Sequence, residues 1–480
     1  MRHFALLLAF FSFSSSALLT AGPADGDGHR IVIEIEGYEQ PILTLANNLL
    51  VNQYIVDTAT RDDKGRFVFA GDNKLPAGIY LAVMAPDNQY FQVLVTDEEQ
   101  EFTIATSKTE TVKKVRIKGS RENVDFFAYL NYLADARKRG DKLREERDAL
   151  AEDAPERENY QQQIDALDGE VEAWQRAYIK KNPTAYTAAI IKSTLPNNPP
   201  EFAGEDARER GWRWMQAHYF DNLDLRDERL LRTPFLFQRI DYFVHKLNVQ
   251  HPDSIAASIG VVLNRMDPKS EMFKTYLIHY LNEAAASKLV GMDAIYVYLI
   301  DNYYAKGLAP WTEEDQLVKF MENADNLRPL LIGKTAPDIE MERRDGSRIS
   351  LHDVEAPYTI LYFWRYDCGH CKKSTPFMKE FYDKWKSRGV ELFAACVKVT
   401  KEVPDCWKYV DENGMNDWLN VVDPYLRSRF VELYDLQQTP QIYILDKNKE
   451  IISKKIGAEQ LDEVMEKIYE LDHPALEMNE

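Results

Sequence analysis

The pattern of apolar and polar positions changes character twice along the chain and divides it into three regions. Residues 30–119 contain short β-prone runs, several of them alternating, separated by turn formers such as DDKG and APDN. The runs are IVIEIE, YIVDTA, RFVFAG, GIYLAVMA, YFQVLV and EFTIAT. Their lengths and spacing predict a small all-β antiparallel sandwich.

The second region, residues 120–330, has a helical pattern and is predicted to be all-α. Apolar residues recur every three or four positions and form one stripe of a helix, made of Tyr160, Ile164, Leu167, Val171, Trp174 and Tyr178. The segment AEDAPER precedes this stripe and suits the turn of a helical hairpin.

The third region, residues 331–480, mixes strands and helices. A strand YTILYFW is followed by a helix, the strand VELFAACV, a helix near residues 404–413 and the strand WLNVVD. A helix over residues 424–434, the strands QIYILD and EIISKKI, and a last helix over residues 458–471 complete the order. This order predicts an α/β domain that ends in a hairpin and a helix.

Residues 1–21 predict export. Arg2 is followed by an apolar run over residues 4–13 and then by small residues, which is the layout of a secretory signal peptide. The run is shorter than the roughly 20 residues of a membrane-spanning helix. We expect an exported, periplasmic protein without a transmembrane segment in the mature chain. Its formal net charge of −19 argues against a nucleic-acid partner, which needs a basic surface.

All four cysteines lie in the last quarter of the chain, which indicates local chemistry rather than the disulfide framework of a secreted protein. In RYDCGHCKKSTP, an apolar strand leads into a helix that begins at Cys368. Free backbone N–H groups and the helix dipole stabilise a thiolate there. Cys371 lies one turn further on and deeper. We predict that Cys368 attacks disulfides and that Cys371 resolves the mixed disulfide.

The other two cysteines leave alternatives open. A zinc site would need a second ligand pair at a suitable spacing, which Cys396 and Cys406 do not supply, so no metal is expected. Cys396 lies in the apolar run FAACV and is most simply a small core residue. A disulfide with Cys406 stays open, because sequence spacing does not show whether the two Cα atoms approach closely enough.

The segment FWRYDCGHCKKSTP resembles the active-site segment of thioredoxin-fold thiol–disulfide oxidoreductases, especially the TlpA-like envelope branch. Pro376 falls where these proteins kink the active-site helix, and Thr439-Pro440 matches their cis-proline position. IGKTAPDI resembles their entry segment, and DKNKEIISKKIG resembles their terminal hairpin. The resemblance covers residues 331–471. The order of a β-domain, a helical region and a redox domain also resembles envelope proteins of Bacteroides-type bacteria.

The resemblance implies a thioredoxin fold, a redox disulfide and no cofactor. The candidate catalytic residues are Cys368, Gly369, His370, Cys371, Thr439 and Pro440. The expected partners are protein disulfide substrates and an envelope thiol that donates electrons. We expect His370 to stabilise the Cys368 thiolate and so to make the disulfide more oxidising, which leaves isomerase or oxidase activity open beside reduction.

Two residues depart from the family pattern, and both concern the proton of Cys371. Tyr362 stands where thioredoxins carry a buried carboxylate, and Ser374 stands where TlpA-like reductases often carry glutamate. Asp367 either replaces these proton acceptors or faces solvent, and the sequence leaves both interpretations open.

Two other functions are compatible with parts of the sequence. A peroxiredoxin uses a threonine or serine three residues before the attacking cysteine, and Arg365 occupies that position. A non-enzymatic envelope scaffold with a thioredoxin-fold docking domain is the other alternative. The intact pair Cys368 and Cys371 argues against it.

Overall fold

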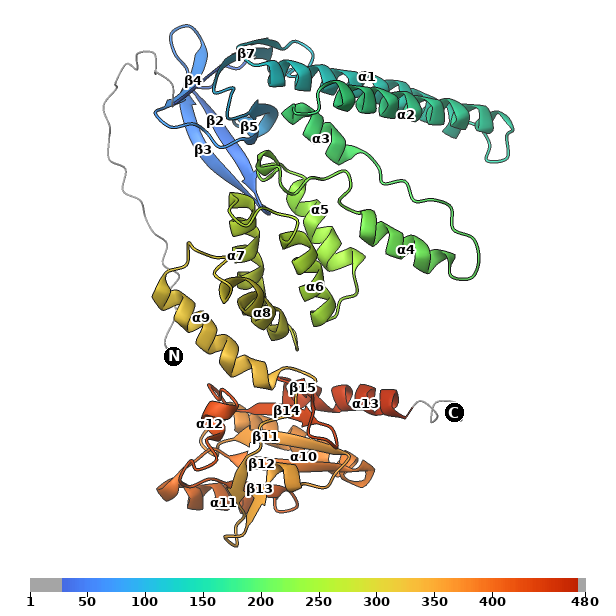
Figure 1. Cartoon of the computed structure of the whole chain (residues 1–480). Coiled ribbons are helices and arrows are strands. Elements are labelled where there is room, and N and C mark those ends of the chain that lie inside the picture. Colours follow the sequence, from blue (N-terminus) through green and yellow to red (C-terminus); the bar gives the residue numbers. More distant parts are fainter. Residues whose placement is uncertain (1–27, 474–480) are drawn as a thin grey trace. The chain divides into compact units, whose positions relative to one another are not determined.

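The computed structural model describes residues 28–473 and divides into two compact units, Met1–Ile240 and Asp241–Glu480. Along the chain, β-strands come first, helices follow, and a mixed sheet with helices comes last (Figure 1). The predicted order of all-β, all-α and α/β regions is therefore confirmed. The boundaries 30–119, 120–330 and 331–480 stay predictions. The expected signal peptide, residues 1–21, lies outside the described residues.

The all-β region forms two four-stranded sheets. The first has the order β4 (Arg66–Gly71), β1 (His29–Glu36), β7 (Glu101–Ser107), β8 (Arg116–Lys118). The second has the order β3 (Asn52–Thr60), β2 (Ile42–Leu49), β5 (Gly78–Met84), β6 (Gln89–Val95). All neighbouring strands pair antiparallel except β1 and β7, which are parallel.

Strand β2 was absent from the predicted runs. Its second half contains Asn47 and Asn48, and asparagine is depleted in strands. Both asparagines are nevertheless buried, and β2 pairs with both β3 and β5. Tertiary burial therefore outweighs local propensity in this strand.

The predicted helical hairpin is confirmed. Helix α1 spans Arg121–Asp148 and helix α2 spans Glu156–Lys181, with the predicted turn between them. Trp174 of the apolar stripe stacks on Tyr132 of α1, with ring centroids 4.7 Å apart, and on Tyr178 at 5.6 Å. The stripe is thus the packing face of the hairpin.

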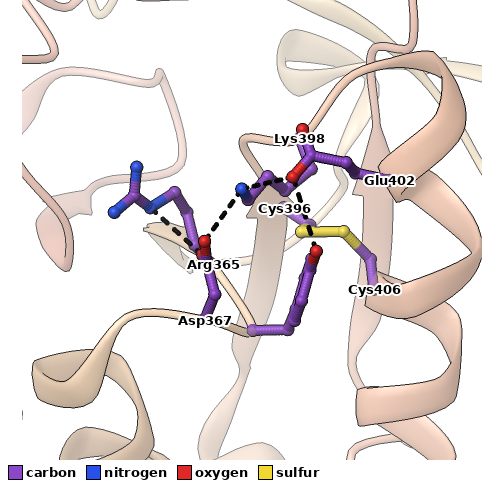
Figure 2. Close-up of a disulfide and its surroundings, with 7 residues drawn as sticks. Arg365, Asp367, Cys396, Lys398, Glu402 and Cys406 are labelled. Atoms are coloured by element: carbon purple, nitrogen blue, oxygen red, sulfur yellow. Dashed lines mark hydrogen bonds and ion pairs between the residues drawn. A yellow bond between two sulfur atoms is a disulfide. The ribbon is translucent and has the colours of Figure 1, made fainter.

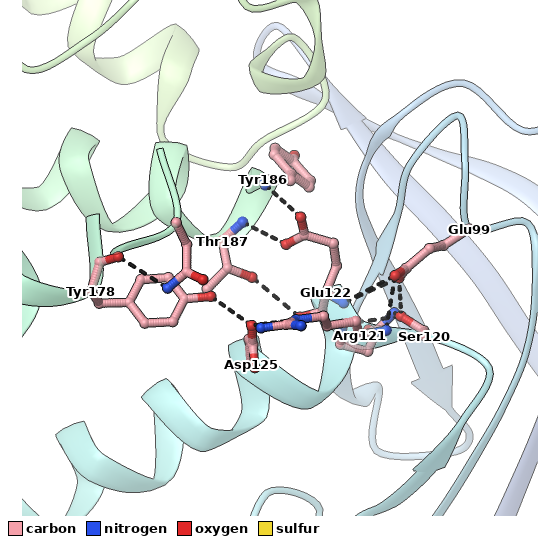
Figure 3. A network of polar contacts seen from close by, with 10 residues as sticks. Glu99, Ser120, Arg121, Glu122, Asp125, Tyr178, Tyr186 and Thr187 are labelled. Carbon is pink, nitrogen blue, oxygen red and sulfur yellow. Dashed lines mark hydrogen bonds and ion pairs between the residues drawn. The ribbon is translucent and has the colours of Figure 1, made fainter. Parts of the chain in front are cut away.

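Two glutamates satisfy the free amides at helix starts in this unit (Figure 3). Glu99 accepts a hydrogen bond of 2.8 Å from the amide of Arg121, at the start of α1. Glu122 accepts one of 2.7 Å from the amide of Tyr186, the first residue of α3 (Tyr186–Thr194). Carboxylates at helix N-termini are favourable because they meet unpaired N–H groups and the positive end of the dipole.

The remaining helices before the C-terminal sheet follow in chain order: α4 (Ala207–His218), α5 (Leu236–Tyr242), α6 (Pro252–Leu263), α7 (Glu271–Ala286), α8 (Asp293–Leu299) and α9 (Glu314–Leu327). Within residues 28–473, every helix is too short or too polar to cross a membrane.

The C-terminal sheet has seven strands and β11 near its centre. Its order is β10 (Arg348–Ser350), β9 (Glu340–Glu342), β13 (Leu419–Val422), β12 (Val390–Cys396), β11 (Tyr358–Trp364), β14 (Gln441–Leu445), β15 (Ile451–Lys454). Strand β11 runs parallel to β12 and antiparallel to β14.

Strand β11 is buried on both faces, and its alternation divides the core in two. Tyr362 and Trp364 belong to the same apolar cluster as residues of α10 (Gly369–Trp385), α11 (Val403–Glu412) and α13 (Leu461–Asp472). Their neighbours Leu361 and Phe363 belong to a separate cluster. The strand therefore leads straight from the core into the cysteine segment.

The predicted helix over residues 424–434 is wrong in extent, because only α12 (Phe430–Leu433) forms. The Asp423 carboxylate accepts a hydrogen bond of 2.7 Å from the amide of Ser428 and holds the chain in a loop. Leu426 and Arg429 have φ of +53° and +54°, the left-handed region, which a right-handed helix excludes.

Candidate active site

The two cysteines of the CGHC segment lie at the start of α10. Cys368 is the N-cap residue, and its Sγ accepts a hydrogen bond of 3.4 Å from the Cys371 amide. Cys371 lies in the first turn of the helix, and both thiols are free. Cys368 is 9% exposed and Cys371 is 1% exposed, so the expectation that Cys368 is the more accessible thiol is confirmed.

The pKa values of the two thiols move in opposite directions. Partial burial acts to raise the pKa of Cys368, but hydrogen bonding by the Cys371 amide and side chain, by the Thr439 side chain and by the His370 amide holds it below its ordinary value. Burial raises the pKa of Cys371 to about 12. Cys368 is therefore the more acidic thiol of the pair, and Cys371 is a neutral thiol at neutral pH.

Alkylation rates against pH should separate the two thiols. In the Cys371→Ala variant, the midpoint for Cys368 should lie below about 8.5, the ordinary pKa of a thiol. In the Cys368→Ala variant, Cys371 should show no midpoint below about pH 10. Because the folded-state pKa of Cys368 is depressed, its thiolate stabilises the fold above the ordinary pKa, and this contribution is lost as pH falls through the lowered value. Equal midpoints near 8.5 would contradict the assignment.

Thr439 and Pro440 face the cysteines, as expected. Their peptide bond is cis, which confirms the predicted geometry, and Cys368 Sγ donates a hydrogen bond of 3.3 Å to the Thr439 carbonyl. Both residues line an open groove of about 730 Å³ beside the cysteines. His370, Lys373 and the half-exposed Phe377 also line this groove.

The structure assigns the influence of His370 to its backbone. The His370 side chain is exposed, and within residues 28–473 its imidazole has no hydrogen-bond or ion-pair partner. Its backbone amide lowers the pKa of Cys368. For Gly369, a side-chain Cβ would meet no atom within 4 Å, so the local packing does not demand glycine there.

Two substitutions of His370 should therefore differ. His370→Pro removes the amide and should raise the pKa of Cys368 and make the Cys368–Cys371 disulfide more reducing, because the thiolate loses a donor. Proline is tolerated in the first turn of a helix, so α10 should still form. His370→Ala keeps the amide and is the control. Redox titration against glutathione measures both potentials, and a larger change for His370→Ala would assign the effect to the imidazole instead.

Asp367 is held at the surface by two cations (Figure 2). Its carboxylate accepts a hydrogen bond of 3.0 Å from Lys398 Nζ, and a second carboxylate oxygen lies 3.6 Å from Arg365 Nε. Partial burial opposes the shift, but Lys398 and then Arg365 hold the pKa of Asp367 below its ordinary value. This favours the surface interpretation of Asp367 over a role as proton acceptor for Cys371.

The positions of the two usual proton acceptors are occupied by hydroxyl groups. Tyr362 is fully buried in the cluster that contains both thiols, and within the described residues its hydroxyl has no hydrogen-bond partner. Burial and then the neighbouring Cys371 raise the pKa of Tyr362 far above its ordinary value, so the phenol stays protonated. Ser374 is buried and lines the groove.

Cys396 and Cys406 form a disulfide, with 6.4 Å between their Cα atoms (Figure 2). Cys396 is buried in the core at the end of β12, as the apolar run indicated, and the disulfide with Cys406 that the sequence left open is formed. Cys396 and Cys406 are each only 1% exposed. Both belong to the core cluster that also contains residues of α10 and α11. Since they bind each other, neither supplies a ligand for a zinc site at the CGHC segment.

Lys398 and Glu402 were missed at the level of sequence. Strands β11 and β12 are parallel, with Trp364 in register with Cys396, so their carboxyl ends meet at one edge of the sheet. A lysine two residues after Cys396 is therefore brought beside Asp367. The signal was the parallel pairing of the two apolar strands, which places the residues after each strand together.

A thioredoxin-like fold with a dithiol at the start of the helix after its central strand defines a class of redox proteins. Known proteins give the family. Residues 332–454 match the AhpC/TSA family. The thiol-disulfide oxidoreductase ResA of Oceanobacillus iheyensis is 32% identical over 136 residues, which are 27% of this chain and 68% of that protein. ResA of Bacillus cereus is 30% identical over 140 residues, 28% of this chain and 78% of that protein. Through this domain the chain belongs to the ResA-like thiol–disulfide oxidoreductases.

The upstream regions match two domains of unknown function, DUF4369 over residues 29–126 and DUF5106 over residues 158–328. Among solved structures, a domain of a possible thiol-disulfide isomerase from Cytophaga hutchinsonii is 39% identical and covers 30% of this chain and 95% of that chain, with a TM-score of 0.28. A thioredoxin-like protein from Bacteroides caccae is 19% identical and covers 57% of this chain and 98% of that chain, with a TM-score of 0.36.

Proposed function

We propose that this chain is an exported thiol–disulfide oxidoreductase that reduces or exchanges disulfides in proteins. The observation that carries the proposal is the position of Cys368 Sγ. It lies at a helix N-cap, against the Thr439 carbonyl and beside an open groove, while Cys371 lies buried behind it. The arrangement suits an accessible nucleophile with a protected second thiol. Export rests on the pattern of residues 1–21.

The proposed reaction has two exchange steps. The Cys368 thiolate attacks one sulfur of a substrate disulfide, the substrate S–S bond breaks, and the other substrate sulfur leaves as a thiolate. Cys371 then loses its proton and attacks the Cys368 sulfur of the mixed disulfide. The substrate sulfur that had been bound to Cys368 then leaves as a thiolate and takes up a proton. Two electrons pass from the dithiol to the substrate, and an envelope thiol donor must reduce the Cys368–Cys371 disulfide again.

The groove beside Pro440 supports a polypeptide substrate. The Thr439 carbonyl faces Cys368 two residues before β14 begins, where an extended chain can add its own backbone hydrogen bonds. Backbone pairing holds a substrate disulfide in line with Cys368 Sγ without requiring a particular side-chain sequence. The half-exposed Phe377 adds apolar surface to the groove. A broad class of disulfide-containing proteins therefore fits this site.

Insulin reduction by the full chain, driven by dithiothreitol, tests the proposal. We expect turnover above the rate with dithiothreitol alone, and no such turnover for the Cys368→Ala/Cys371→Ala variant. A folded wild-type protein without cysteine-dependent turnover would instead support a scaffold with a docking domain. Titration against glutathione then separates a reductase, near thioredoxin at about −270 mV, from an isomerase, near protein disulfide isomerase at about −180 mV.

A further inference from the structure

The side chains just before Cys368 are all engaged in one polar network (Figure 2). Asp367 accepts a hydrogen bond from Lys398 and lies near Arg365, as described above. The Tyr366 hydroxyl donates a hydrogen bond of 3.4 Å to Glu402, and Lys398 Nζ lies 5.2 Å from the centre of the Tyr366 ring. Tyr366 and Asp367 therefore contact Lys398 or Glu402 directly, and Arg365 joins the network through Asp367.

Lys398 is the centre of this network. Its side chain is only 12% exposed and lies between two carboxylates, at 3.0 Å from Asp367 and 2.6 Å from Glu402. Shielding from water and salt strengthens such pairs relative to exposed ones. The hydrogen bonds that Lys398 donates to Glu402 and to Asp367 raise the pKa of Lys398, so the amine stays charged. The charged groups that face the network are Arg365, Asp367, Lys398, Glu402 and, beside Tyr366, Asp405.

The loop that carries Lys398 and Glu402 is tied down at both ends. It lies between Cys396 and Cys406, which form the disulfide. Its first residue, Val397, donates a backbone hydrogen bond of 2.9 Å to the Trp364 carbonyl, directly before the cysteine segment. A closed loop loses little further conformational entropy when its side chains are held, so Lys398 is pre-organised for Asp367.

The segment that Lys398 holds also contacts both sulfur-bearing residues. The Cys368 amide donates a hydrogen bond of 3.4 Å to the Arg365 carbonyl, and the backbone of Arg365 also acts on the Cys371 thiol. A shift of residues 365–367 would therefore change the surroundings of both cysteines. Without Lys398, the Asp367 carboxylate directly before Cys368 would keep only Arg365, at 3.6 Å, as a cationic partner, and more of its negative charge would oppose a thiolate at Cys368.

We propose that Lys398 is a positioning residue for the reactive cysteine. By binding Asp367 it fixes residues 365–367 and neutralises the carboxylate that precedes Cys368. The inference rests on the proposed role of Cys368 as the attacking thiol. It gives the Cys396–Cys406 loop a function in the reaction, because the loop presents Lys398.

The test is the pH profile of Cys368 alkylation in the full chain with Cys371→Ala, where Cys368 is the single free thiol. Lys398→Met should move the midpoint up by about half a pH unit, which is roughly a threefold loss of thiolate near neutral pH. Lys401→Met is the matched control, because Lys401 is exposed on the same loop. Lys401→Met should leave the alkylation midpoint of Cys368 unchanged. Lys398→Arg, which keeps the positive charge, should have a midpoint close to that of the parent protein.

Adding Asp367→Asn to Lys398→Met separates the charge effect from a loss of stability. The double variant should return the midpoint most of the way to that of the parent protein, since the carboxylate that lost its lysine partner is gone. An unchanged midpoint in Lys398→Met, or a shift that Asp367→Asn does not reverse, would overturn the proposal. Alkylation needs no protein substrate, so this outcome is independent of insulin reduction. Melting temperatures of all variants report whether the fold is retained.

Discussion

The Cys371→Ala variant is expected to accumulate mixed disulfides with its substrates, whereas the Cys368→Ala variant should form none. Cys368 supplies the attacking thiolate, so without it the first exchange step does not occur. Cys371 supplies the second attack, so without it the first covalent product persists. Both variants should lose all cysteine-dependent turnover in the insulin assay. This asymmetry is the largest effect that the geometry predicts.

The measurement is non-reducing electrophoresis after expression of the full-length variants with export to the cell envelope. Species of high mass that collapse on adding dithiothreitol should appear with Cys371→Ala alone. The variant that lacks both cysteines is the control for nonspecific crosslinks through the rest of the chain. Equal trapping by both single variants would show that Cys371 also attacks substrates, in conflict with its 1% exposure. Mass spectrometry of the trapped species would identify the substrates and the electron donor.

The cysteine pair followed from local sequence, because an apolar strand that runs into a helix places Cys368 at an N-cap. The position of Thr439 opposite Cys368 was implied by the family resemblance. The predictions that were wrong concerned elements whose structure depends on contacts between distant residues. Strand β2 is fixed by burial despite Asn47 and Asn48, and the Asp423 carboxylate replaced most of a predicted helix by a loop.

The second disulfide and the Lys398 network show the same limit. Whether Cys396 reaches Cys406 depends on how α11 folds back onto the end of β12, which residue spacing does not report. Lys398 and Asp367 are 31 residues apart in sequence. They meet because β11 and β12 pair in parallel. The sequence pattern predicted the chemistry of the cysteine pair but not the residues that hold the pair in place.

The Cys396→Ala/Cys406→Ala variant should destabilise the C-terminal domain by about 3 kcal/mol. The disulfide closes a loop with a sequence separation of 10, and the entropy that such a crosslink removes from the unfolded chain corresponds to about that value. Because the chain has several domains, one global free energy of unfolding is not well defined, and a local probe is needed. Cys371 provides one, since it is buried in the same core cluster as the disulfide.

With Cys368→Ala as the background, alkylation of Cys371 requires the domain to open. Removing the disulfide should raise this rate by about 150-fold, the factor that corresponds to 3 kcal/mol when opening is in fast equilibrium. The matched control keeps the cysteine side chains: the same background protein is unfolded, reduced and refolded, so that Cys396 and Cys406 remain as thiols. If only the alanine variant opens faster, lost packing rather than the crosslink stabilises the domain. If both proteins open faster, the crosslink itself stabilises the domain. The loop that presents Lys398 is then held rigid by the Cys396–Cys406 disulfide.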